Sequence, residues 1–205
     1  MQLLLASNNQ KKHAELSRML RPLEIEVLLP RDVGGLDDVD EDQPTFAGNA
    51  RKKALAAATE KGLLSLADDS GLEVERLDGA PGVFSARFAG EPHDDGANNA
   101  LLLEKLAGVA DEDRGARFVC ALCLARPDGS VVAEIQGTAS GRILHEPRGD
   151  GDFGYDPLFL FTEPGFPQTG RGFAELSPEE KSEVSHRGRA LRELTHDLEK
   201  HIRTR

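Results

Sequence analysis

Leu66-Ala67-Asp68-Asp69-Ser70-Gly71-Leu72 is the most informative segment of this chain, because it joins an apolar run to two adjacent carboxylates. The apolar residues before Asp68 are typical of a buried strand. Taking two carboxylates out of water costs free energy unless a metal ion or a shared proton compensates the charge. The alternative is that Asp68 and Asp69 cap a turn before Gly71, since aspartate favours turns. The rest of the sequence is needed to distinguish these two interpretations.

Strand and helix patterns alternate on the N-terminal side of this stretch. Thr45 is the expected N-cap of an alanine-rich helix, and Gly62 is its expected stop. The predicted elements are, in order, a strand at residues 3–6, a helix after residue 9, a strand at 25–29, a helix at 46–61 and a strand at 63–67 that delivers the aspartates.

The C-terminal side continues the alternation. Residues 78–96 are rich in Gly, Pro and Asp and predict a loop, and a helix begins at Asp94 and ends near Gly108. Pro127-Asp128-Gly129 predicts a hairpin turn between strands at 116–125 and 131–138. Ser177-Pro178-Glu179-Glu180 predicts a capping box, and a last helix follows at about 187–202. These elements predict an α/β fold with a mixed sheet in a single folding unit.

Composition narrows the class of protein. The 205 residues carry a formal net charge of −11, which opposes binding to a nucleic-acid polymer but not to one small nucleotide. No window approaches the ~18 apolar residues that a membrane span requires. Residues 1–6 lack the basic start and apolar core of a signal peptide, so we expect a cytoplasmic protein without a membrane partner.

The only cysteines, Cys120 and Cys123, have the C-x-x-C spacing of some redox and zinc sites. They fall within a predicted strand, where residues three apart point to opposite faces. A zinc site would also need a second ligand pair at suitable spacing, which the sequence does not offer. We therefore predict two reduced core thiols.

Ser7-Asn8-Asn9-Gln10-Lys11-Lys12 lies between the first predicted strand and helix. Free backbone N–H groups and the helix dipole favour an anion such as phosphate at such a position. Serine and asparagine are also ordinary helix caps, and lysines are usually solvated, so this segment alone does not establish a site. Magnesium is the usual metal for oxygen ligands beside phosphate.

Six motifs in order carry a resemblance to a known family. They are Ser7 to Glu15, Thr45-Phe46-x-x-Asn49-Ala50, Asp68 to Leu72, Gly79 to Arg87, Phe153-Gly154-Tyr155-Asp156-Pro157, and Ser185-His186-Arg187-Gly188-x-Ala190-Leu191. The chain resembles the inosine/xanthosine triphosphate pyrophosphatases, from Gln2 to about Leu191. These enzymes cut deaminated purine triphosphates (ITP, dITP, XTP) at the α-β phosphoanhydride to the monophosphate and pyrophosphate.

The resemblance implies an architecture and partners. It implies one pyrophosphatase domain over residues 1–205, with an elongated mixed sheet flanked by helices and two lobes around a central nucleotide-binding cleft. It also implies a magnesium requirement, a small-molecule nucleotide substrate and a homodimer.

The resemblance further assigns roles to residues that match the family's motifs. Asp69, Asp68 and Lys12 match catalytic positions, and Asp40, Glu41 and Asp69 match metal-holding positions. Substrate-binding positions match Ser7, Asn8, Asn9, Gln10, Lys11, Lys12, Lys53, Ser70 and Lys181, and the base-recognising segment matches Phe153, Gly154, Tyr155, Asp156, His186 and Arg187.

Phosphoryl chemistry fits this assignment, because it needs cations around the phosphates and a carboxylate that orients or deprotonates water. Glu41 and Asp69 would hold magnesium, while Asp69 or Asp68 activates water for attack at the α-phosphorus; the sequence does not divide these two roles. A donor such as Arg187 fits the 6-keto group of hypoxanthine and xanthine. The amino group of adenine would leave that donor unpaired, at a cost of about 1–3 kcal/mol.

Two positions depart from the family pattern. Gly48 stands where the family often has Glu, and Gln43-Pro44 stands where a glycine is expected. The first change removes a capping partner, and the second predicts a different path for the loop that carries Asp40 and Glu41.

Three other functions stay open at this stage. The chain could be a non-catalytic nucleotide-binding module, a pyrophosphatase for other modified or pyrimidine nucleotides, or a scaffold that uses the apolar face of its last helix. The full set of lysines and carboxylates argues against the first, and Ser185-His186-Arg187 favours purines over pyrimidines.

Overall fold

The computed structural model describes residues 1–151 and 153–203, with side chains described as far as Leu198. The strands are β1 (Gln2–Leu5), β2 (Glu26–Leu28), β3 (Ser65–Val74), β4 (Gly115–Ala125), β5 (Val131–Ile143) and β6 (Phe159–Phe161). The helices are α1 (Gln10–Leu20), α2 (Phe46–Lys61), α3 (Asp95–Lys105), α4 (Pro178–Val184) and α5 (His186–Arg203).

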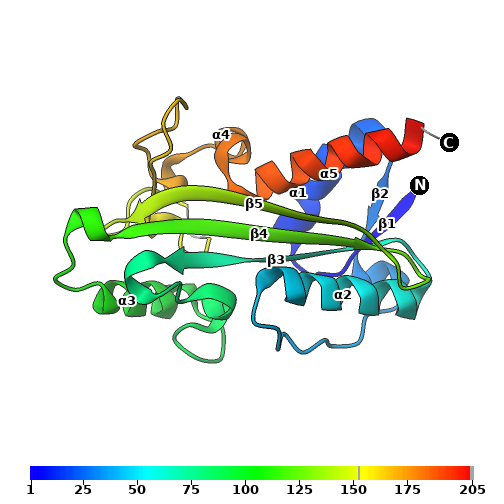
Figure 1. Ribbon diagram of the computed structural model, residues 1–205, viewed down its shortest axis with the longest axis horizontal. Coiled ribbons are helices and arrows are strands. Elements are labelled where there is room, and N and C mark those ends of the chain that lie inside the picture. Colours follow the sequence, from blue (N-terminus) through cyan, green and yellow to red (C-terminus); the bar gives the residue numbers. More distant parts are fainter. Residues whose placement is uncertain (152, 204–205) are drawn as a thin grey trace. The chain divides into compact units, whose positions relative to one another are not determined.

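The strands form one sheet in the order β2-β1-β3-β4-β5-β6 (Figure 1). β1 is parallel to both β2 and β3, with Leu3 opposite Val27 and Leu5 opposite Leu66. β5 and β6 are antiparallel, with Ile143 opposite Phe159. The sheet is therefore mixed and flanked by helices, which confirms the predicted α/β fold.

The chain forms two compact units. Unit 1 comprises residues 1–69, 120–136 and 190–205, and unit 2 comprises residues 70–119 and 137–189. Each unit has its own apolar core. The central cleft implied by the family resemblance stays a prediction.

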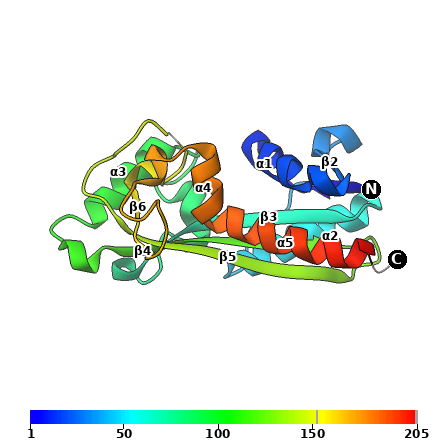
Figure 2. The same cartoon turned by 90° about the horizontal axis from the view of Figure 1, so that it is seen from above.

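In unit 1, helices cover both faces of the strands. Leu16 and Leu20 of α1 share one core with Leu191 and Leu194 of α5, and both helices lie above the strands in Figure 1, with α2 below them; Figure 2 gives the view from above. The opposite face is covered by α2, whose buried residues are mostly alanines. Small side chains let this helix approach the strands closely, which matters because α2 carries Asn49 and Lys53.

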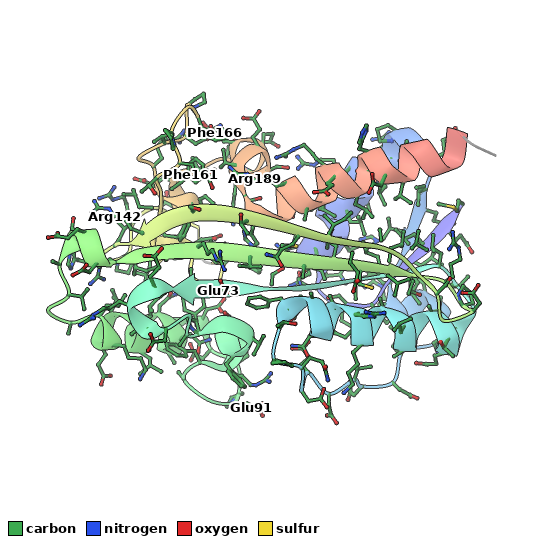
Figure 3. The ribbon with its side chains drawn as sticks, in the orientation of Figure 1. Glu73, Glu91, Arg142, Phe161, Phe166 and Arg189 are labelled. Atoms are coloured by element: carbon green, nitrogen blue, oxygen red, sulfur yellow. The ribbon has the colours of Figure 1, made fainter. Side chains whose placement is uncertain are left out.

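In unit 2, aromatic rings make much of the core. Phe118 and Phe173 stack with centroids 5.7 Å apart, and Phe159 tilts against both rings. At the edge of this core the guanidinium of Arg189 lies 5.9 Å from the Phe161 ring and 5.3 Å from the Phe166 ring (Figure 3). Such cation-π contacts fix the start of α5 against the end of β6.

The bounds of α2 are those predicted. Thr45 Oγ1 accepts the Gly48 N–H at 3.1 Å, and Gly62 closes the helix with φ +66°. The capping box of α4 is also present, since Ser177 and Glu180 bond reciprocally. Local capping chemistry therefore determines these helix ends.

β3 differs from the predicted strand at 63–67. It begins at Ser65 and runs to Val74, so Asp68 and Asp69 lie inside the strand. The alternative that these aspartates cap a turn is wrong. β6 was not predicted at all, because it has only three residues and pairs with a distant segment.

The two cysteines are free and buried on β4, as predicted. Burial raises the pKa of Cys123 to about 11, so its thiol stays protonated at neutral pH. Among the described residues, no helix is both long enough and apolar enough to cross a membrane.

Candidate active site

Asp68 and Asp69 lie on opposite faces of β3, because successive side chains of a strand alternate. Both residues are buried, with exposures of 4% and 8%. β1 pairs with β3 only as far as Leu5 and Leu66. The edge of β3 beyond this point is open to side chains from α1 and α2, at the carboxyl end of two parallel strands, where α/β proteins usually bind ligands.

Lys12 pairs with Asp68 on the α1 face. Its Nζ lies 2.6 Å from Asp68 Oδ1 and donates to the Asp68 carbonyl at 3.3 Å. The Cys120 thiol lies 3.5 Å from Asp68 Oδ2. Both oxygens of this buried carboxylate therefore have donors, so its burial alone does not require a metal ion or a shared proton.

Lys53 holds two carboxylates together on the α2 face. Its Nζ lies 2.7 Å from Glu41 Oε1 and 3.1 Å from Asp69 Oδ1. The same ammonium donates to the Asp68 carbonyl at 3.3 Å, which is also a partner of Lys12. Two lysines and three carboxylates from distant segments therefore converge on one point of the β3 edge.

These charges change the pKa values of the group. Burial is the largest influence on Asp69 and raises its pKa, Lys53 lowers it and Glu41 raises it, and the resulting pKa lies above the usual value. Burial lowers the pKa of Lys53, but Asp69 and Glu41 outweigh this, so the pKa of Lys53 is raised. The lysine stays charged, and Asp69 is more basic than an exposed aspartate.

Asn49 was not assigned a role from the sequence. It is 1% exposed; its Nδ2 donates to Asp69 Oδ2 at 3.2 Å, and its Oδ1 accepts the Gln43 N–H at 3.0 Å. It therefore joins Asp69 to the loop that carries Glu41. An asparagine on the inward face of an alanine-rich helix was the available signal, because a buried amide requires partners.

The donor set suits magnesium bound together with phosphate. No group of three or more His, Cys, Asp or Glu side chains among the described residues could hold a metal ion alone. Glu41 and Asp69 are nevertheless near enough to share one ammonium, and magnesium commonly uses one or two carboxylates and completes its shell with phosphate and water. Asp40 is exposed, and its backbone carbonyl, which accepts Lys52 Nζ at 2.9 Å, makes its contact with α2.

Ser7 and Asn9 cap the N-terminus of α1. Asn9 Oδ1 accepts the N–H groups of Lys11 and Lys12, and Ser7 Oγ accepts that of Asn9. These bonds occupy several of the donors that would otherwise face an anion. Gln10 and Lys11 are exposed.

Ser7 and Asn8 line a pocket of about 750 Å³ together with Lys53, residues 36–39 and part of α2. A pocket of this volume is typical of a site for a small ligand. Predicted phosphate-binding residues of two separate segments therefore share one hollow of unit 1.

A second group of predicted residues lies in unit 2. Lys181 forms an ion pair with Asp156 and lies 5.6 Å from the centre of the Phe153 ring. Asp156 is buried, with 5% exposure. Lys181 was predicted to bind the substrate, and these contacts associate it with the predicted base-recognising segment.

The start of α5 brings together the remaining predicted residues. Arg187 Nη2 lies 3.4 Å from Ser70 Oγ, and the buried His186 ring stacks on Phe118 with centroids 4.7 Å apart. Gly188 is required by a close approach, since a Cβ there would lie 1.9 Å from the Ser182 carbonyl oxygen. The His186-Arg187-Gly188 sequence thus fixes how α5 leaves α4.

Known proteins similar to this chain identify its family. The model of the Ham1 family matches residues 3–197. The dITP/XTP pyrophosphatase of Desulforamulus reducens is 53% identical over 192 residues, which cover 94% of this chain and 92% of that protein. The dITP/XTP pyrophosphatase of Corynebacterium glutamicum (strain ATCC 13032) is 49% identical over 201 residues, 97% of each chain.

Solved structures are also similar. The Ham1 protein of Staphylococcus aureus superposes with a TM-score of 0.87 at 38% identity, covering 98% of this chain and 100% of that one. A Ham1 protein from Coxiella burnetii gives 0.88 at 40% identity, covering 98% and 99%. The chain belongs to the Ham1 family.

Proposed function

We propose that this protein hydrolyses the deaminated purine triphosphates ITP, dITP and XTP to the monophosphate and pyrophosphate. The observation that carries the proposal is the Lys53 ammonium between Glu41 and Asp69, beside the Lys12–Asp68 pair. Enzymes named dITP/XTP pyrophosphatase, at about half identity over nearly the whole chain, support the substrate class.

Asp69 is the proposed base. Asn49 holds its second oxygen in place, and a carboxylate fixed in this way can accept a proton from water. Lys12 and Lys53 would offset the charge of the phosphates and of the leaving pyrophosphate. Asp68 orients Lys12 rather than the water, because both of its oxygens already have donors.

We propose magnesium as the cofactor, held by Glu41 and Asp69. When bound, it would supply positive charge that stabilises the phosphates as charge develops. Lys53 pairs with both carboxylates, so its ammonium would have to give up at least part of that contact if they held magnesium. It is then available for a phosphate oxygen.

Base recognition is assigned to unit 2. The Phe153 ring offers a stacking surface, and Lys181 and Arg187 offer donors to keto oxygens. Adenine carries an amino group at the same position and would leave such a donor unpaired, which costs about 1–3 kcal/mol. The selectivity for hypoxanthine and xanthine over adenine follows.

The family resemblance also supports a homodimer in the cytoplasm, where nucleoside triphosphates are consumed. Sedimentation velocity tests the first point, since a dimer has twice the monomer mass of 22.2 kDa. Fractionation of the source cells tests the second.

Pyrophosphate release tests the proposed reaction. We expect strong release from ITP, dITP and XTP with magnesium, little from ATP or GTP, and loss of release with EDTA. A folded sample that releases nothing from any of these substrates would favour a non-catalytic nucleotide-binding module. Release only from other modified or pyrimidine nucleotides would favour the related pyrophosphatase.

A further inference from the structure

The first two turns of α3 bind both backbone groups of Gly154. The Gly154 N–H donates to Asp95 Oδ2 at 2.9 Å, and Asn99 Nδ2 donates to the Gly154 carbonyl at 2.8 Å. Residues four apart lie on the same face of a helix, so Asp95 and Asn99 together clamp the two peptide groups on either side of the Gly154 Cα. The other oxygen of Asp95 lies 3.0 Å from His93 Nε2.

The same part of α3 also binds the segment 85–89, which contacts the Tyr155 side chain. Asn98 Nδ2 donates to the Ala86 carbonyl at 3.1 Å, and Asn98 Oδ1 accepts the Ala89 N–H at 2.7 Å. The Tyr155 hydroxyl donates to the Ser85 carbonyl at 2.8 Å. Gly154 and Tyr155 are therefore fixed by one connected set of bonds that starts from α3.

The backbone conformation of Gly154 determines where the residues on either side of it lie. Gly154 has φ +56°, and the Asp156 N–H closes the turn by donating to the Phe153 carbonyl at 3.1 Å. Phe153 and Asp156 are the two partners of Lys181 in this segment. Movement of the backbone at Gly154 would therefore displace the groups proposed to contact the base.

We propose that Asp95 and Asn99 are positioning residues that determine base selectivity by fixing the Phe153–Asp156 turn. This inference rests on the proposed function of that turn. Neither side chain is expected to touch the nucleotide. Hydrogen bonds discriminate between bases only when their donors are held in position. The groups proposed for the reaction, Lys12, Lys53 and Asp69, are held by other partners than Asp95 and Asn99. Losing the clamp should therefore change substrate choice more than it changes turnover.

Steady-state kinetics with ITP and ATP test the proposal. For Asp95→Ala and Asn99→Ala we expect the ratio of kcat/KM for ITP to that for ATP to fall about 10- to 100-fold, mostly through KM for ITP. Asp95→Asn keeps an acceptor oxygen and should recover part of the ratio. Asn99→Asp places a carboxylate against the Gly154 carbonyl and should lower the ratio as much as Asn99→Ala.

Asp94→Ala is the matched control. Asp94 caps the same helix through the Ala97 N–H at 2.9 Å, whereas the Gly154 bonds described above are made by Asp95 and Asn99. It should weaken α3 while the ITP-to-ATP ratio stays unchanged. If Asp95→Ala and Asn99→Ala change the ratio no more than Asp94→Ala does, the positioning role is overturned.

Amide hydrogen exchange at Gly154, followed by NMR, tests the clamp without using activity. We expect at least tenfold faster exchange in Asp95→Ala than in Asp94→Ala. Equal rates in these two variants would overturn the clamp even if the wild-type enzyme prefers ITP. If the wild-type enzyme shows no preference for ITP over ATP, the proposed function is wrong, and the clamp then has no role in base selectivity.

Discussion

Asp69 combines burial with three polar neighbours, Asn49, Lys53 and Glu41, the last through their shared lysine. Asp69→Asn keeps the size of the side chain but removes its charge and basicity. We expect kcat to fall by about 10²- to 10⁴-fold, the usual contribution of a general base. Pyrophosphate release measures this fall, and circular dichroism verifies that the variant is folded.

Asp128→Asn is the control for that substitution, because Asp128 lies in the exposed β4–β5 turn, where its carboxylate accepts the N–H and the hydroxyl of Ser130. Its activity should match that of the wild type. Undiminished turnover by folded Asp69→Asn would reject the assignment of the base.

Gly48 and Gln43, the two positions expected to depart from the family pattern, are neighbours in space. A Cβ at Gly48 would lie 2.8 Å from Gln43 Cβ and 3.2 Å from Thr45 Oγ1. The absent side chain at one position thus makes room for the larger side chain at the other. We infer that the two departures compensate each other.

A double-mutant cycle tests this compensation. Gly48→Glu alone should lower the free energy of unfolding by about 1–3 kcal/mol, because overpacking outweighs the better helix propensity. In the Gln43→Gly background the same substitution should instead stabilise by about 1 kcal/mol, since Glu at this third helical position can complete a capping box with Thr45. Urea denaturation measures both. Additive effects would contradict the coupling.

At the scale of elements, Glu163 joins three parts of unit 2. Its Oε1 accepts the Ser140 N–H of β5 at 2.7 Å, and its Oε2 lies 2.8 Å from Arg189 Nη2 of α5. It follows closely after β6, and Figure 3 shows Arg189 beside Phe161 of that strand. Burial raises the pKa of Glu163, but the bonds from Arg189 and Ser140 outweigh it, so the pKa is lowered.

Glu163→Gln should lower the free energy of unfolding by about 1–2 kcal/mol at neutral pH. A lowered native pKa contributes stability above the usual carboxyl value and loses it as the pH falls through the native value. The difference between wild type and Glu163→Gln should therefore shrink in acid, which urea denaturation at neutral and acidic pH can measure.

Glu134→Gln provides the comparison, because the exposed Glu134 forms a long ion pair, with its Oε1 3.9 Å from Arg51 Nη1. We expect it to change stability by less than about 1 kcal/mol at any pH. A difference for Glu163→Gln that stays constant with pH would contradict the electrostatic explanation.

The elements differ in how far the sequence predicted them. Both ends of α2 follow from Thr45 and Gly62, because capping is local chemistry. β3 was predicted to stop before Asp68, and aspartates are indeed disfavoured inside strands. Lys12 and Lys53 from other elements neutralise the charges of these aspartates. No local sequence pattern contains that information. β6 depends on pairing with a distant strand and was missed for the same reason.

The candidate site shows the same division. Predicted residues Lys12, Glu41, Lys53, Asp68 and Asp69 do come together. The residues that hold the site in place, Asn49 and Asn99, were assigned no role. Asn99 bonds to a residue 55 positions away, which spacing along the chain cannot indicate.

At the scale of the whole molecule, β3, β4 and β5 each contain residues of both units. A strand that loses its order therefore affects both cores. We expect one cooperative thermal transition by calorimetry, with equal van't Hoff and calorimetric enthalpies.

Leu122→Ala in unit 1 and Phe118→Ala in unit 2 change neighbouring parts of β4. Each should destabilise the protein by about 2–5 kcal/mol and lower the same transition temperature. Two separate transitions, of which each substitution moves only one, would show that the units unfold independently.

Tyr155 makes the protein optically simple, because the chain has one tyrosine and no tryptophan. Tyrosine emission therefore comes from a single side chain within the turn that α3 clamps. Burial raises the pKa of its phenol above the usual value, so native protein in alkaline solution should show no tyrosinate absorbance where free tyrosine already does. One unlabelled chromophore should thus report the arrival of a purine at the turn through its emission, and the opening of the fold through its ionisation.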